Sequence, residues 1–289
     1  MADVLLVTGA SSGLGVEIAA QAAQAGYRTY ATMRDTAKRA ALDEAASAAG
    51  ATIEVLPLDV TDSASVDRAI ATVLEREGRI DVLIANAGVG FVRTTEQASD
   101  EDVTWVMDTN FHGVLRCTRA VLPHMRAAGR GRVVAVSSIG GLVGQPMNEI
   151  YCASKFALEG YFEALSTYVT PAFGVHFTVV EPGAISSDFA ANVMQQIGRS
   201  GGLLEDDYAP IMQRYLADRE WKRDPGLYQS PAEVAAKVME GLAMDCPPLR
   251  MRTSDWAENF CQLKTGLDPD GLKQAGQVSR MMLGEFTND

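Results

Sequence analysis

Short apolar runs alternate with segments of helical periodicity along most of the chain. Most runs are rich in β-branched residues and end in glycine, asparagine, aspartate or serine, which is typical of buried parallel strands. The predicted strands are Val4–Val7, Arg28–Thr32, Thr52–Leu58, Asp81–Ala85, Arg132–Val136, His176–Glu181 and Leu249–Arg252. This alternation predicts an α/β fold in which a doubly wound parallel sheet of about seven strands carries helices on both faces.

The segments between the strands have the periodicity and capping residues of helices. The predicted helices are Val16–Ala25, Ala37–Ala49, Ala64–Arg76, Asp100–Arg126, Tyr151–Ala172 and Val234–Met244. Regular periodicity is lost over 189–229, where apolar and aromatic residues are mixed with glycines. We therefore expect a lid over an apolar substrate there, and a C-terminal extension without a motif over 253–289.

Composition limits the other classes of function. The 289 residues carry no linker and fit one domain over 1–289, and 37 acidic against 25 basic residues give a net charge of −12. Without a Lys/Arg cluster, nucleic acid or an anionic membrane is not expected as a partner. Neither a signal peptide nor a membrane span is predicted, so we expect a cytoplasmic protein. The four cysteines lack metal-binding spacing, and no metal site is predicted.

A glycine-rich turn, TGASSGLG (Thr8–Gly15), follows the first strand and precedes an alanine-rich helix. Gly9 permits a tight turn, and Gly13 and Gly15 allow the backbone to approach a pyrophosphate at the positive end of the helix. The turn predicts a dinucleotide site in a Rossmann fold. Its expected nucleotide-binding residues are Gly9, Ser11, Ser12, Gly13, Leu14 and Gly15.

The end of the second strand bears on the choice of nucleotide. An acidic residue there would bind the 2′-hydroxyl of NAD(H), but the chain reads Thr32, Met33, Arg34. A guanidinium can instead pair with a 2′-phosphate, so Arg34 favours NADP(H) over NAD(H). Two alternatives stay open: Asp35 turns toward the ribose, or Arg34 is only a solvated charge.

Candidate catalytic residues follow the fifth strand. Ser138 stands at the end of that strand, and Tyr151 and Lys155 lie on one face of the next helix at i and i+4. A neighbouring ammonium would lower the pKa of the phenol and make it usable in proton transfer. Asn110 lies in the middle of a predicted helix, where a buried asparagine needs hydrogen-bond partners.

Ser138, Tyr-x-x-x-Lys from Tyr151 to Lys155, and the Thr8-Gly9-x-x-x-Gly13-x-Gly15 turn together resemble the short-chain dehydrogenase/reductase (SDR) family. The segment 133–165 is most similar to its estradiol and retinol dehydrogenase members. The resemblance implies that Asn110 joins the catalytic residues through a bound water, and that Ser12 assists Arg34. It also implies nucleotide contacts by Asp59, Val60, Asn86, Ala87, Gly88, Tyr151, Lys155, Pro182, Gly183, Ile185 and Ser187. For Asp59, a role as a turn acceptor remains an alternative.

The resemblance implies an NADP(H)-dependent oxidoreductase that interconverts a secondary alcohol and a ketone on an apolar substrate, of the steroid, retinoid or aryl/alkyl ketone class. Tyr151 would exchange the proton, Ser138 would hold the oxygen, and Lys155 would bind the nicotinamide ribose. A homodimer or homotetramer is expected. The alternative is a non-catalytic regulator that senses the dinucleotide with the same fold.

Overall fold

The computed structural model describes residues 2–199, 201–217, 224 and 226–283. Its centre is a seven-stranded sheet in which all neighbouring strands are parallel. In spatial order the strands are β3 (Ile53–Pro57), β2 (Arg28–Met33), β1 (Val4–Thr8), β4 (Val82–Ala85), β5 (Gly131–Val136), β6 (Val175–Glu181) and β9 (Arg250–Arg252). The predicted doubly wound α/β fold is confirmed.

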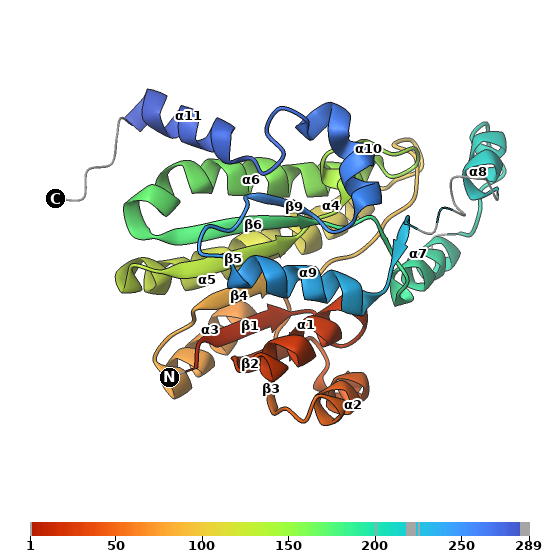
Figure 1. Ribbon diagram of the computed structural model, residues 1–289. Coiled ribbons are helices and arrows are strands. Elements are labelled where there is room, and N and C mark those ends of the chain that lie inside the picture. Colours follow the sequence, from red (N-terminus) through yellow and green to blue (C-terminus); the bar gives the residue numbers. More distant parts are fainter. Residues whose placement is uncertain (1, 200, 218–223, 225, 284–289) are drawn as a thin grey trace.

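Helices cover both faces of the sheet (Figure 1). One layer comprises α1 (Gly13–Gln24), α2 (Ala40–Ala48) and α9 (Pro231–Ala243), and the other α3 (Ser63–Glu77), α5 (Gly113–Ala128) and α6 (Glu149–Phe173). Each face has its own hydrophobic core: the first core lies under α1, α2 and α9, and the second under α3, α5 and α6. Successive residues of β1 point to opposite faces, so Leu5 and Val7 join the first core and Val4 and Leu6 join the second. Two hydrophobic cores thus hold the carboxyl edge of the sheet in place.

Two predicted helices differ in detail. The helix predicted over Asp100–Arg126 is α4 (Asp100–Met107), one π-helical turn (Asp108–His112) and then α5. The helix predicted from Ala37 is preceded by a short 3-10 helix, η1 (Thr36–Lys38). The π turn contains an extra residue per turn, a feature that is frequent at functional sites.

The expectation of irregular structure over 189–229 was wrong for much of that segment. It contains α7 (Asp188–Arg199) and α8 (Ala209–Leu216), separated by Gly201 and Gly202 with φ of 95° and 78°. A two-stranded pair, β7 (Ala184–Ile185) with β8 (Tyr228–Gln229), frames the segment. Figure 1 shows α7 and α8 on the side to which the strands point. The part of the prediction at 200, 218–223 and 225, with Trp221, lies outside the described residues.

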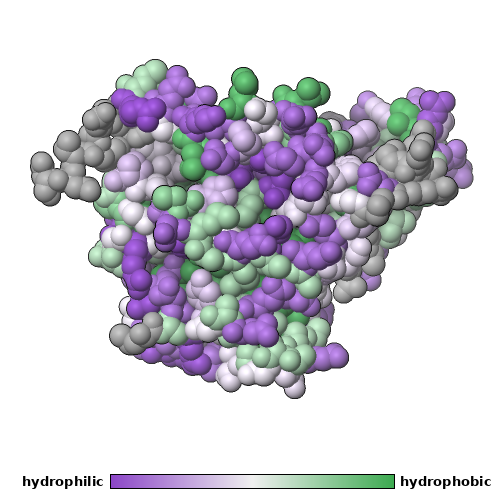
Figure 2. Space-filling model, in the orientation of Figure 1, coloured by the Kyte–Doolittle hydropathy of each residue, from purple (hydrophilic) through white to green (hydrophobic). Residues whose placement is uncertain are grey.

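The C-terminal segment also forms helices, α10 (Asp255–Thr265) and α11 (Leu272–Leu283), and α11 packs against α6. The view in Figure 2 is mostly hydrophilic, with hydrophobic residues protruding over α10 and around α8. Leu263 and Ile211 are among the exposed apolar side chains of these helices. Within the described chain, no helix combines the length and hydropathy needed to cross a bilayer.

Candidate active site

The glycine turn between β1 and α1 leaves no room for side chains. Gly9 has a φ of 72°, and a Cβ atom on it would lie 2.7 Å from the Cα of Ala87. A Cβ atom on Gly15 would lie 2.3 Å from the carbonyl oxygen of Gly9. Ser11 is half-buried beside the turn, and Leu14 is buried in the first core. The backbone is therefore free for close approach by a ligand at the amino terminus of α1.

Asn86, directly after β4, braces this turn. Its Nδ2 donates to the carbonyl oxygens of Thr8 and Gly9, at 2.9 Å and 3.1 Å. In return, the Thr8 hydroxyl accepts from the backbone N–H groups of Asn86 and Ala87, both at 3.1 Å. Sequence reasoning missed Thr8 as a bracing residue, although its hydroxyl directly precedes the first glycine.

At the end of β2, Arg34 is exposed and makes no hydrogen bond or ion pair within the described part of the chain. The Asp35 carboxylate instead caps η1, accepting from the backbone N–H of Ala37 at 3.0 Å. Ser12 is exposed at the amino terminus of α1 and its side chain makes no capping hydrogen bond. The backbone N–H of Ala10 donates to the Thr32 carbonyl at 2.9 Å, which ties the glycine turn to the end of β2.

Asp59 and Val60 follow β3 at the same edge of the sheet. One Asp59 oxygen, Oδ1, accepts from the backbone N–H and the hydroxyl of Thr61, at 2.9 Å and 2.8 Å. Oδ1 of Asp59 thus acts as a turn acceptor, and Asp62 is the residue that caps α3. Val60 is buried against Gly113, where a Cβ atom would lie 2.8 Å from the Val60 Cβ.

Ser138 and Tyr151 meet beyond the end of β5. The Ser138 hydroxyl accepts from the backbone N–H of Gly140 at 3.0 Å, and the backbone N–H of Ile139 donates to the Pro182 carbonyl at 3.0 Å. Burial raises the pKa of the Tyr151 phenol to about 12, while a hydrogen bond with Ser138 acts to lower it. The phenol is therefore protonated at neutral pH.

Lys155 lies one helical turn after Tyr151. Its Nζ donates to the Val136 carbonyl at 2.9 Å and lies 5.7 Å from the centre of the Tyr151 ring. Burial lowers the pKa of Lys155 to about 8, and the Glu159 charge acts to raise it. Sequence reasoning expected Lys155 to lower the Tyr151 pKa, but burial is the largest influence on both groups and disfavours both charged forms.

Asn110 sits fully buried in the π turn. Its Oδ1 accepts from the Val89 N–H at 2.7 Å, and its Nδ2 donates to the Val89 carbonyl at 2.9 Å and to the Ser154 hydroxyl at 3.0 Å. Ser154 in turn donates to the Tyr151 carbonyl at 2.7 Å. Gly88 lies close to both Asn110 and Lys155, since a Cβ atom on it would lie 3.3 Å from Asn110 Oδ1 and 3.6 Å from Lys155 Nζ. Val89 and Ser154 were not singled out from the sequence.

The loop after β6 brings the last predicted residues to the glycine turn. Ile185 lies on β7, paired with Gln229, and the backbone N–H of Ser187 donates to the Ile185 carbonyl at 2.9 Å. A Cβ atom on Gly13 would lie 3.5 Å from the Ser187 Cβ. Gly183 lies where a Cβ atom would be 3.3 Å from the Leu227 carbonyl oxygen.

The segment of α7 and α8 packs onto this site through apolar contacts. Val92, Met147, Ile197 and Met212 form a buried cluster that joins these helices to the loops before α4 and α6. Arg93, also buried, donates to the carbonyl oxygens of Ile197 and Gly202, at 3.3 Å and 2.8 Å. These contacts place apolar side chains near the carboxyl edge.

The assembled edge offers a protonated phenol, a serine hydroxyl and an ammonium beside a backbone turn shaped for a phosphate. Such groups can bind an oxygen atom and exchange its proton. No cluster of three metal-ligating side chains occurs among the residues that the structure describes.

The chain is similar to known proteins over most of its length. Residues 3–198 match the model of the family described as short chain dehydrogenase. Retinol dehydrogenase 8 from Bos taurus is 38% identical, over 94% of this chain and 88% of that protein. The human 17-beta-hydroxysteroid dehydrogenase type 1 is 36% identical, over 98% of this chain and 86% of that protein.

Solved structures share the fold. A mutant actinorhodin polyketide ketoreductase with NADPH superposes with a TM-score of 0.74 at 29% identity, covering 89% of this chain and 98% of that one. A short chain dehydrogenase/reductase from Burkholderia phymatum in complex with NAD gives a TM-score of 0.74 at 22% identity, covering 100% and 97%. The fold alone therefore does not select between the two nucleotides.

Proposed function

The chain belongs to the short-chain dehydrogenase family of oxidoreductases, and from this premise we propose that it interconverts a secondary alcohol and a ketone on an apolar substrate with NADP(H). The observation that carries the proposal is the meeting of Ser138, Tyr151 and Lys155 beside Asn110 at the edge that also holds the glycine turn.

In the proposed reaction each residue has one task. Ser138 holds the substrate oxygen by a hydrogen bond, and Tyr151 gives that oxygen its proton during reduction or removes it during oxidation. Lys155 supports the phenolate that forms and binds the nicotinamide ribose. Asn110 holds the π turn against Val89 and Ser154, and so keeps the Tyr151 turn of α6 in place. The nucleotide, when bound, supplies or accepts the hydride.

The residues at the glycine turn fit a dinucleotide. Gly9 lies against Ala87 and Gly15 lies against Gly9, so neither position has room for a side chain. Only backbone therefore faces a ligand at the amino terminus of α1, where a pyrophosphate is favoured. Around it we assign the following to nucleotide binding: Ser11, Ser12, Gly13, Leu14, Arg34, Asp59, Val60, Asn86, Ala87, Gly88, Pro182, Gly183, Ile185 and Ser187.

The proposed substrate is apolar because the lid is apolar. Met212 and Ile197 pack against Val92 and Met147 beside the site. The relatives named for retinol and for a hydroxysteroid support this choice of substrate class.

A turnover assay tests the function. A panel of steroid, retinoid and aryl or alkyl ketones is incubated with NADPH or NADH, and loss of the reduced-nucleotide absorbance is followed. We expect turnover of at least one ketone. Nucleotide binding without turnover of any ketone would instead favour the dinucleotide-sensing regulator.

Arg34→Ala is expected to lower kcat/KM for NADPH by about ten- to a hundredfold and to leave that for NADH almost unchanged. The exposed Arg34 guanidinium has no partner among the described residues and can form a charge-assisted pair with a 2′-phosphate. Steady-state kinetics with both nucleotides measure this preference.

Asp35→Ala is the matched control for that experiment. Because the Asp35 carboxylate caps η1, its loss should leave the ratio of the two kcat/KM values unchanged. Equal losses with both nucleotides in Arg34→Ala, or a wild type faster with NADH, would contradict the assignment of Arg34.

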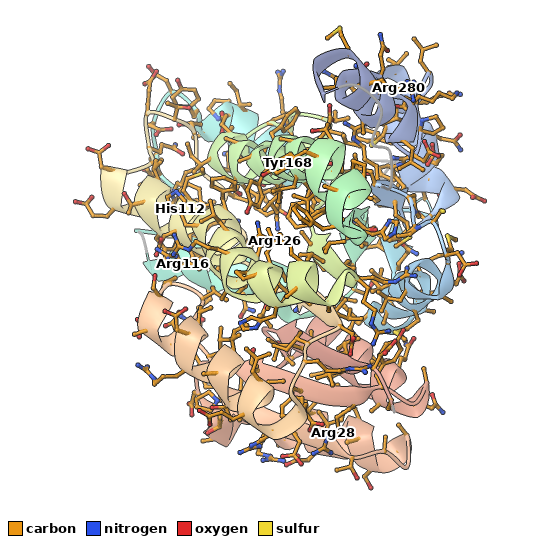
Figure 3. All side chains as sticks on the ribbon, turned by 90° about the vertical axis from the view of Figure 1, so that its left-hand side faces the viewer. Arg28, His112, Arg116, Arg126, Tyr168 and Arg280 are labelled. Atoms are coloured by element: carbon orange, nitrogen blue, oxygen red, sulfur yellow. The ribbon has the colours of Figure 1, made fainter. Side chains whose placement is uncertain are left out.

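A homodimer or homotetramer is expected in solution. Two neighbouring helices expose large apolar side chains, Trp105 on α4 and Phe156, Tyr168 and Phe173 on α6. Figure 3 shows Tyr168 and Arg126 on the face formed by neighbouring helices, where Arg126 stacks on Phe173 at 5.1 Å from the ring centre. Such a face suits an isologous contact. A monomer mass by light scattering at micromolar concentration would contradict this expectation.

A further inference from the structure

Behind the catalytic residues lies a second, buried group of charges. Glu159 follows Lys155 by one turn on α6, and Glu181 ends β6 beside it. Both carboxyl groups are buried, Glu181 completely. Arg250 and Arg252, on the neighbouring β9, reach toward them. None of these four side chains has a task in the proposed reaction.

The two carboxyl groups are not equally compensated. Arg252 holds Glu181, with 3.0 Å between Nη1 and Oε2, and its side chain is itself buried. Arg250 pairs instead with Glu163, and its Nε is 3.9 Å from Glu159 Oε2, beyond hydrogen-bond distance. A negative charge is therefore stabilised more strongly on Glu181 than on Glu159.

Buried oxygen atoms without hydrogen-bond partners gather at the same place. Within the described chain they include both side-chain oxygens of Glu159, Oε1 of Glu181 and the Ser137 hydroxyl. Two of these oxygen atoms lie next to Gly141, since a Cβ atom on it would lie 2.6 Å from Ser137 Oγ and 2.8 Å from Glu159 Oε1. The Ser137 hydroxyl can donate to only one of the three carboxyl oxygens, so two ionised carboxylates would leave two of these acceptors unsatisfied, whereas one proton supplies a further donor.

The surrounding charges agree with this reading. Burial raises the pKa of Glu159 well above its ordinary value and the Glu181 charge adds to the rise, while the Ser137 hydroxyl and the Arg250 charge oppose it. Burial also raises the pKa of Glu181, and the Arg252 charge opposes that rise. The ionisable groups that face the pair are Lys155 and Glu163 of α6, Arg250 and Arg252 of β9, Glu258 and Cys261 of α10, and Asp268 through Arg250. Burial raises the pKa of the Cys261 thiol to about 12, so the thiol adds no charge.

We propose that Glu159 and Glu181 hold one proton between them, that it resides on Glu159, and that the pair's negative charge thereby stays beside Arg252 and away from Lys155. Glu159 is then a positioning residue: its neutral form does not compete with Tyr151 for the Lys155 ammonium, and it leaves the Lys155 pKa without the rise that a Glu159 charge would add. An ionised Glu159, one helical turn from Lys155, would draw that charge away and make the Tyr151 phenolate harder to form. The inference rests on the proposed function for its kinetic consequence only.

Glu181→Gln is the variant that moves the charge. Without Glu181, the remaining carboxyl group ionises next to Lys155. We expect the alkaline-rising limb of kcat/KM for alcohol oxidation to shift upward by about one pH unit, since a carboxylate one helical turn from Lys155 weakens the support that the ammonium gives to the phenolate. This corresponds to about a tenfold loss below the limb.

Two further variants separate charge from packing. Glu159→Gln fixes the neutral state and should keep the wild-type pH profile. The double variant, Glu159→Gln with Glu181→Gln, should return the pH profile to that of the wild type, although it removes one more native side chain than Glu181→Gln alone. A purely structural role would make the double variant worse than either single variant, and an unshifted Glu181→Gln profile would overturn the proposal.

Infrared spectroscopy at neutral pH tests the proton without any turnover. The wild type should show the C=O stretching band of a buried protonated carboxylic acid, and Glu159→Gln and Glu181→Gln should both lack it. A wild type without the band, or a band that persists in Glu159→Gln, would overturn the proposal. If no ketone is turned over, the proposed function fails while the infrared result still decides whether the two carboxyl groups hold a proton.

Discussion

Tyr151→Phe is expected to lower kcat for ketone reduction by about 10²- to 10⁴-fold while NADPH binds almost as in the wild type. The substitution deletes only the phenolic hydroxyl, which meets Ser138 in a buried site. The ring remains and fills the same space. Steady-state kinetics give kcat, and a fluorescence titration gives the dissociation constant of NADPH.

Tyr161→Phe is the matched control on the same helix. Tyr161 packs edge-on against Phe111 and Phe162, at ring-centre distances of 5.9 Å and 5.7 Å, and lies outside the proposed site. Its loss of a hydroxyl should leave kcat unchanged. A Tyr151→Phe enzyme that keeps most of its turnover would remove Tyr151 from the proton-transfer step.

The sheet could be predicted because its signal is local. Runs such as Val4–Val7 and Arg132–Val136 combine β-branched residues with a sharp glycine or serine end, and the structure places both in the parallel sheet as predicted. The helices α7 and α8 were missed because apolar residues, glycines and polar residues alternate too closely there for a clear period. Their apolar faces are identified only when Val92 and Met147 are seen packed against them.

The candidate site, too, could be predicted from the sequence only in part. Ser138, Tyr151 and Lys155 could be found because their spacing carries the chemistry. The brace between Asn86 and Thr8 joins residues 78 positions apart, and the ion pair between Arg252 and Glu181 joins residues 71 positions apart. Such contacts depend on which strands become neighbours, and the chain order does not state this.

Lys155→Met is expected to lower kcat by about 10²- to 10⁴-fold and also to weaken NADPH, because one ammonium serves both the phenolate and the ribose. The buried methionine side chain keeps most of the volume of lysine. Tyr151→Phe and Lys155→Met should therefore differ in the dissociation constant of NADPH, which only the second change raises. Equal nucleotide affinity in the two variants would contradict the second task of Lys155.

The same substitution has a predictable effect on stability. Burial lowers the pKa of Lys155 from 10.5 to about 8, so between these values the unfolded chain binds more protons and the wild type gains stability as pH rises. Lys155→Met lacks this gain. The wild-type minus variant difference in the free energy of unfolding should rise by about 2 kcal/mol from about pH 8 to pH 10. Denaturant unfolding of both proteins across this range measures it, and a difference that stays constant would mean that Lys155 keeps its ordinary pKa in the folded protein.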